Sequence, residues 1–208
     1  MPGIVHVVDD DASFRTAIQR RLEKAGYRVV TYASAQQLLD RCPDESGPGC
    51  ILLDVRLPGL SGPELQSRLT ELGSTLPVVF LTAYADVSTT VKAIKAGADD
   101  FLIKPVNSDQ LLSSIEKAIA RHETARGLKA ELEALRRRLS TLTPRQRQVF
   151  DLVVRGKTHK HAARELGSSE RTVKAHRQVI MEKMKVQSLV QLVTIAERLG
   201  VLQGSGPG

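Results

Sequence analysis

Five polar residues in the first half of the chain each stand where a short apolar run ends. Asp9 and Asp10 follow IVHVV, Asp54 ends CILLD, Thr82 ends VVFLT, and Lys104 follows FLI. Short apolar runs bounded by polar or turn residues are typical of strands in a buried parallel sheet. Because the carboxyl ends of parallel strands lie at one edge of an open α/β sheet, we expect these five side chains to meet in one crevice.

Together these side chains suit the acceptance of a phosphoryl group. Carboxylates that share a site resist joint ionisation unless a cation is present, and Mg²⁺ suits a few carboxylates plus a phosphoryl group. We predict that Asp54 is the nucleophile and that Asp10 and Asp54 hold Mg²⁺, with Asp9 supporting the metal through water. Lys104 is expected to pair with one phosphoryl oxygen as a point charge, and Thr82 to donate a hydrogen bond to another.

The elements that position these residues alternate between strand and helix. Strands are predicted near residues 4–9, 28–32, 50–54, 77–82 and 100–103. Helices fill the intervals, from about Asp11, from Ser61 or Gly62 to Leu72, from about Val87 to Ala96, and from about Asn107 onwards. This alternation predicts a parallel sheet with helices on both faces.

The helix that begins near Asn107 continues into a short heptad pattern. Its apolar residues have the 3-4-3-4-3 spacing of a and d positions, and they are Ala125, Leu128, Leu132, Leu135, Leu139 and Leu142. Glu131 at a g position and Arg136 at the following e′ position suit a parallel dimer. The alternative is a single amphipathic helix lying on one domain, and Gly127 costs about 1 kcal/mol relative to Ala inside a helix.

Four shorter helices are expected after this pattern. Thr143, Pro144 and Gln146 form a capping box with proline at the first helical position, and Gly156 closes that helix. The others are expected over about 159–166, over ERTVKAHRQVIMEKM after a serine cap, and over about 188–199, followed by a flexible GSGPG tail. The arrangement predicts a small all-helical domain.

Charge is divided unevenly between the two parts of the chain. Residues 1–121 carry 13 basic and 15 acidic side chains, a net charge of −2, whereas residues 122–208 carry 17 and 8, a net charge of +9. This asymmetry predicts two domains with different partners, the basic one suited to a polyanion. No apolar stretch approaches the length of a membrane helix, and no secretory signal is evident, so we expect a cytoplasmic protein without membrane contact.

The acidic part resembles the receiver domain of bacterial two-component response regulators. The resemblance covers residues 4–121 and is carried by DDD at 9–11, Asp54-x-x-x-Pro58-Gly59, Thr82-Ala83 and Lys104-Pro105. It implies a flavodoxin-like strand order 2-1-3-4-5, a histidine kinase as phosphoryl donor, and a cis bond before Pro105. It further implies that Thr82 and Phe101 change orientation after phosphorylation, and that the backbone carbonyl of Arg56 is a metal ligand.

An enzymatic alternative is a phosphatase of the haloacid-dehalogenase type, which also uses an aspartate nucleophile. Such enzymes place an acid/base aspartate two residues later, where this chain has Arg56, and the loop 55–61 contains no other acid. We therefore expect a phosphoryl acceptor with at most slow self-dephosphorylation rather than an enzyme. Arg56 and Tyr84 lie two residues after Asp54 and Thr82, at the rim of the expected site, where Tyr84 could obstruct an incoming water and prolong the phosphoryl lifetime.

The basic part resembles the LuxR-type helix-turn-helix of FixJ/NarL-type regulators. The residues that carry the resemblance are Leu142, Thr143, Arg147, Val149, Gly156, Ala163, Leu166, Thr172, Val173, His176, Lys183 and Met184. A capped helix with basic and amide side chains on one face suits the major groove of DNA. The expected DNA-contacting residues are Lys174, Ala175 and Gln178 at base edges, and Arg171, Thr172, Arg177 and Lys160, with the three basic residues mainly at phosphates.

This part departs from the family at four positions. The family usually has Asn at 159, an acid at 161, and Ile at 162 and 168, where this chain has His159, His161, Ala162 and Ser168. Loss of both isoleucines predicts a smaller core or altered packing. The two histidines could be metal ligands, but no Cys or further His stands nearby in sequence, so phosphate or solvent contact is the favoured interpretation.

These patterns, together with the two resemblances, predict an α/β receiver domain (1–121), a helical linker (122–141), an all-α helix-turn-helix domain (142–203) and a tail (204–208). The expected function is transcriptional control by phosphorylation, with Mg²⁺ as cofactor. The expected partners are a histidine kinase, promoter DNA and a second copy of the chain when phosphorylated, with RNA polymerase as a further candidate. The rival interpretation is a receiver that acts by docking proteins, with a degenerate DNA-binding domain.

Overall fold

The computed structural model describes residues 3–83 and 97–202, and the chain divides into two compact units, Met1–Arg126 and Gly127–Gly208. The helix expected over 87–96 and the rim residue Tyr84 lie outside the described residues.

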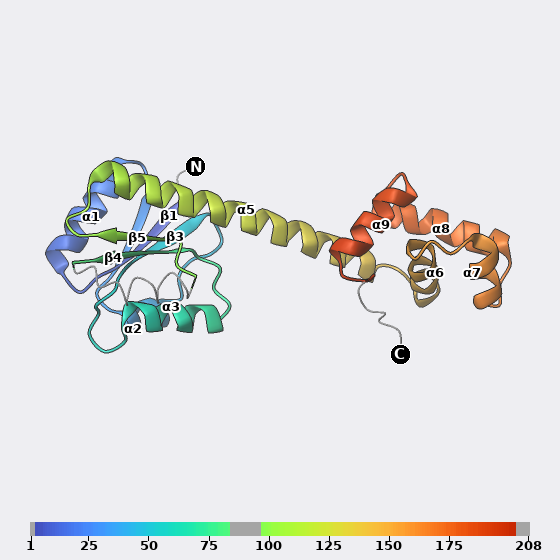
Figure 1. Ribbon diagram of the computed structural model, residues 1–208, viewed down its shortest axis with the longest axis horizontal. Helices are drawn as coiled ribbons and strands as arrows, with labels where there is room; N and C mark the ends of the chain where they lie inside the picture. Colours follow the sequence, from blue (N-terminus) through green and yellow to red (C-terminus); the bar gives the residue numbers. More distant parts are fainter. Residues whose placement is uncertain (1–2, 84–96, 203–208) are drawn as a thin grey trace. The chain divides into compact units, whose positions relative to one another are not determined.

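The first unit is built on a five-stranded parallel sheet (Figure 1). Its strands are β1 (Ile4–Val8), β2 (Arg28–Tyr32), β3 (Gly49–Asp54), β4 (Val78–Thr82) and β5 (Asp100–Ile103). The order is β2-β1-β3-β4-β5, as the family resemblance implied. The strands β1, β3 and β4 are buried along their whole length, which explains why their sequences are continuous apolar runs rather than alternating ones.

Helices cover both faces of this sheet (Figure 1). Helices α1 (Ala12–Lys24) and the first part of α5 (Ser108–Ser140) pack on one face, and α2 (Ala35–Arg41) and α3 (Gly62–Glu71) pack on the other. The alternation of side chains along each strand therefore supplies two separate cores. The doubly wound α/β fold predicted from the sequence is confirmed.

Two of these helices begin at side-chain caps beside the carboxyl edge of the sheet. Asp11 accepts hydrogen bonds from the backbone N–H of Ser13 at 2.8 Å and of Phe14 at 3.1 Å, which starts α1 directly after β1. Ser61 and Glu64 form a capping box at the start of α3. Such caps satisfy N–H groups that have no partner inside the helix, and they fix the loops that carry the polar residues.

Gly62 is required where α3 passes close to the end of β3. A methyl group added at Gly62 would lie 2.4 Å from the carbonyl oxygen of Asp54 and 3.0 Å from the ring of Phe80. Gly62→Ala should therefore lower the free energy of unfolding by about 1–3 kcal/mol, measured by urea denaturation. Gly47→Ala is the matched control, since nothing lies within 4 Å of its added methyl group. Equal losses in the two variants would show that the contact with Asp54 is unimportant.

The second unit holds the four short helices α6 (Pro144–Val154), α7 (His159–Glu165), α8 (Glu170–Met184) and α9 (Leu189–Arg198). Their apolar faces form one core, which includes Val149, Phe150, Val173 and Ile180. Ala162 is fully buried in this core, so the position where the family usually has Ile keeps its inward orientation with a smaller side chain. The helical fold predicted for this part is confirmed.

A side-chain cap starts each of these helices, and one lysine joins α8 to the start of α6. Thr143, Thr158, Ser169 and Ser188 cap α6, α7, α8 and α9 respectively, each accepting a backbone N–H bond. Lys183 near the end of α8 donates to the carbonyl oxygen of Thr141 at 2.8 Å and to the Gln146 side chain at 2.9 Å. These bonds fix the end of α8 against the start of α6.

Residues 122–140 of the expected linker are the continuation of α5, which passes through Gly127 without a break. In the second unit, Leu139 and Leu142 pack against the helical core and Leu135 is only 5% exposed, whereas Leu128 is 58% exposed. Half of the a/d residues, namely Leu135, Leu139 and Leu142, are thus buried at least in part within the second unit itself. None of the described helices could span a membrane, and α5, the longest at 33 residues, is interrupted throughout by charged side chains.

Candidate functional site

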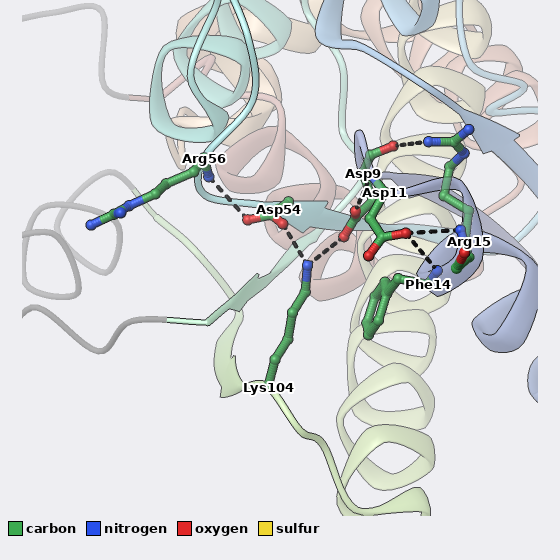
Figure 2. Close-up of polar contacts among 8 residues, drawn as sticks. Asp9, Asp11, Phe14, Arg15, Asp54, Arg56 and Lys104 are labelled. Carbon is green, nitrogen blue, oxygen red and sulfur yellow. Dashed lines mark hydrogen bonds and ion pairs between the residues drawn. The ribbon is translucent and has the colours of Figure 1, made fainter.

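The residues predicted to form the phosphoryl-accepting site meet at the carboxyl edge of the sheet. Asp9 follows β1, Asp54 and Thr82 end β3 and β4, and Lys104 follows β5. The Lys104 ammonium lies 2.5 Å from a carboxylate oxygen of Asp9 and 2.5 Å from one of Asp54 (Figure 2). Asp9, Asp10 and Asp54 each offer one carboxylate oxygen, and these three oxygens lie within 4.8 Å of one another.

Backbone donors orient the two buried carboxylates. Asp9 accepts the N–H of Asp11 at 2.9 Å, and Asp54 accepts the N–H of Arg56 at 3.0 Å (Figure 2). The backbone N–H of Lys104 donates to the carbonyl oxygen of Thr82 at 2.7 Å, which ties the loop after β5 to the end of β4. The polar groups are therefore held by strand ends and by the first residues of the following loops, on a rigid scaffold.

The electrostatics of this edge suit a cation. Asp9 is 1% exposed and Asp54 is 8% exposed. Burial raises the pKa of Asp9, although its bonds to Lys104 and Asp11 oppose that rise. Burial alone would lower the pKa of Lys104, but its hydrogen bonds to Asp54 and Asp9 outweigh this and raise it. With all groups ionised, three carboxylates and one ammonium leave an excess of two negative charges, which a divalent cation would balance.

Two contacts at this site were not anticipated from the sequence. The Lys104 ammonium lies 4.1 Å from the centroid of the Phe14 ring, and Arg15 donates to the carbonyl oxygen of Asp9 at 2.6 Å (Figure 2). Phe14 and Arg15 both lie in the first turn of the helix that follows the acidic cluster, and this position is the signal that could have identified them.

The predicted switch residues lie at the end of β4 and within β5. Thr82 is 1% exposed at the end of β4, whereas Phe101 in β5 is half-buried. The Phe101 ring lies 6.3 Å from that of Phe80, its neighbour in β4. The side chain of Arg56 is at the exposed rim, and the peptide bond between Lys104 and Pro105 is cis.

In the second unit, the predicted DNA-contacting residues share the outer face of α8 and the start of α7. Those exposed to solvent are Lys160, Arg171, Thr172, Lys174, Ala175 and Gln178. Arg177 is half-buried, and its guanidinium contacts the His159 ring at 3.2 Å. His161 lies 3.7 Å from Glu165, and neither histidine belongs to a group of potential metal ligands among the described residues.

Two family descriptions match these two units. Residues 5–116 match the response regulator receiver domain, and residues 140–196 match the bacterial regulatory proteins of the luxR family. The chain is a response regulator of the FixJ/NarL family. This family joins a receiver to a LuxR-type helix-turn-helix, so the chain is a two-component transcription factor, for which a kinase and DNA are the implied partners.

Relatives of this response regulator match along nearly the whole chain. It is 40% identical over 200 residues to the transcriptional regulatory protein FixJ of Bradyrhizobium diazoefficiens, covering 96% of this chain and 97% of FixJ. It is 38% identical to the response regulator protein TodT of Pseudomonas putida, covering 95% and 86%. Among solved structures, the response regulator StyR is 41% identical with a TM-score of 0.85, covering 95% of this chain and 100% of StyR.

Proposed function

We propose that Asp54 of this response regulator accepts a phosphoryl group from a histidine kinase, with Mg²⁺ held by Asp9, Asp10, Asp54 and the backbone carbonyl of Arg56. The observation that carries the proposal is the Lys104 ammonium, which contacts the carboxylates of Asp9 and Asp54 at once. When bound, the metal would neutralise charge on the carboxylates and on the incoming phosphoryl group. Lys104 is then available to contact a phosphoryl oxygen, with Thr82 as a second donor.

The proposal is tested with a small-molecule phosphoryl donor and intact-mass spectrometry of the full chain. In the presence of Mg²⁺, the mass should rise by one phosphoryl group. Chelation of divalent cations should suppress this rise, because the acidic cluster would then repel the incoming phosphoryl group. Labelling that proceeds equally well in chelator would contradict the proposed metal requirement.

Phosphorylation must next be coupled to DNA binding, and we place this coupling in dimer formation. To change the ratio of dimer to monomer from 1:99 to 99:1, phosphorylation must stabilise the dimer relative to the monomer by about 5.5 kcal/mol. The a/d pattern of α5 offers one surface for the dimer. The family resemblance offers a second, around residues 87–103, of which only 97–103 are described.

On DNA, we assign Lys174, Ala175 and Gln178 of α8 to base edges, and Arg171, Arg177 and Lys160 mainly to phosphates. The exposed positions of these side chains, apart from the half-buried Arg177, support this assignment. Thr172 is also exposed on α8, but its hydroxyl contacts the Ser169 hydroxyl at 2.8 Å at the helix cap. The Thr172 hydroxyl thus has a partner within the cap of the recognition helix.

Gln178→Ala should weaken binding to the operator by about 1–3 kcal/mol and relax sequence preference at one base pair, because a base contact is lost. Arg171→Ala is the contrasting variant. It should weaken binding to all sequences alike and flatten the salt dependence by about one unit of slope, because a phosphate contact is lost. Competition binding with operator and random DNA separates the two effects. If Gln178→Ala weakens both DNAs equally, its base-reading role is wrong.

A further inference from the structure

The Arg177 guanidinium lies within hydrogen-bonding distance of the His159 ring in the second unit. The guanidinium of arginine has only donors, so its Nη1 group must donate to a lone pair on His159 Nε2, 3.2 Å away. The Nε2 atom accepts this bond in the tautomer that carries its proton on Nδ1. The contact is therefore a hydrogen bond that orients Arg177 from the first residue of α7.

The two residues line a hollow on the surface of the helix-turn-helix. Lys174 and Gln178 complete its lining, so the proposed base-reading residues and Arg177 border the same space. None of the four lining side chains is acidic. A hollow with two cationic side chains beside an amide is suited to the phosphate backbone that borders a base pair.

We propose that His159 is a positioning residue for DNA binding, which holds the Arg177 guanidinium in this hollow so that it contacts one DNA phosphate. The inference rests on the proposed role of α8 as the recognition helix. An unrestrained arginine loses side-chain freedom when it binds, and a guanidinium already held by His159 loses less. His159 thus acts on DNA affinity through Arg177.

The test uses the full chain, phosphorylated by a small-molecule donor, and a short DNA duplex of random sequence, because phosphate contacts do not depend on sequence. His159→Ala should weaken binding about three- to tenfold, the cost of ordering one long side chain. His159→Asn should keep most of the wild-type affinity, since the asparagine amide oxygen can also accept a hydrogen bond from Arg177. His161→Ala is the matched control, because His161 is an exposed neighbour that lies near Glu165 instead.

The deciding measurement is the double-variant cycle. Arg177→Ala should weaken binding and flatten the salt slope by about one, and adding His159→Ala to it should cause no further loss. A loss at His159→Ala that is the same with and without Arg177 would overturn the proposal, as would no loss at all. If Arg171→Ala also leaves affinity unchanged, the proposed role of α8 itself fails. If Arg171→Ala weakens binding while the His159 variants do not, only the positioning role fails.

Discussion

Asp54→Asn should abolish the uptake of a phosphoryl group from a small-molecule donor, and intact mass should then stay at that of the unmodified chain. The amide keeps the size of the side chain and an oxygen that can accept the Arg56 N–H, but it removes the carboxylate nucleophile. It also removes one of the three charges that would hold the metal. We expect DNA binding of this variant to lose its response to the donor.

The fold should survive this substitution. Lys104 keeps its ion pair with Asp9, and the caps at Asp11 and Ser61 do not involve Asp54. Circular dichroism and thermal unfolding provide the check. Asp40→Asn is the matched control, since Asp40 is an exposed carboxylate on α2 and should label like the wild type. Undiminished labelling of Asp54→Asn would show that another residue accepts the phosphoryl group.

The sheet and its polar edge were predictable because a parallel strand is buried on both faces. Continuous apolar runs such as ILL before Asp54 mark both the strand and the point where it ends. The polar residue at that point must then lie at the carboxyl edge, whatever the loop lengths. Helix starts were predictable for a similar reason, because Asp11 and Thr143 carry the cap in the local sequence.

Contacts between elements were less predictable. Nothing near Lys104 in sequence indicates that its ammonium lies against Phe14, or that Arg177 contacts His159, because these pairs are set by packing. The a/d spacing of α5 likewise does not indicate whether its apolar side chains pack on their own unit or on a second chain. Leu139 packs on the core of its own unit, and Glu131 accepts two bonds from Arg198 at 2.7 Å, although the heptad pattern pairs Glu131 with Arg136 of a second chain.

These contacts change the design of a dimer test. Glutamate at Leu132 and Leu139 is the choice that the heptad pattern alone suggests. Leu139→Glu would place a charge against the core of the DNA-binding unit, so a loss of DNA binding could come from unfolding. Leu128 is 58% exposed and Leu132 is half-buried. The pair Leu128→Glu and Leu132→Glu therefore probes the expected dimer interface with less damage to the DNA-binding unit.

The double variant Leu128→Glu/Leu132→Glu should abolish the phosphorylated dimer in analytical ultracentrifugation and weaken operator binding, while phosphoryl uptake stays normal. In a parallel dimer, these d and a positions face the same positions of the partner chain, so the substitutions bring like charges together in an apolar seam. Loss of each leucine from such a core costs about 2–5 kcal/mol, and 1.4 kcal/mol already changes the dimer constant tenfold.

The matched control changes charge equally on the outer side of the helix. Ala130→Glu with Arg137→Gln also lowers the net charge by two, at exposed f positions, and should leave the dimer intact. If the leucine variant dimerises and binds DNA as well as this control, the α5 extension is only a tether. The dimer surface would then lie on the receiver, around residues 87–103, and phosphorylation would act there through Thr82 and Phe101 rather than through the helix.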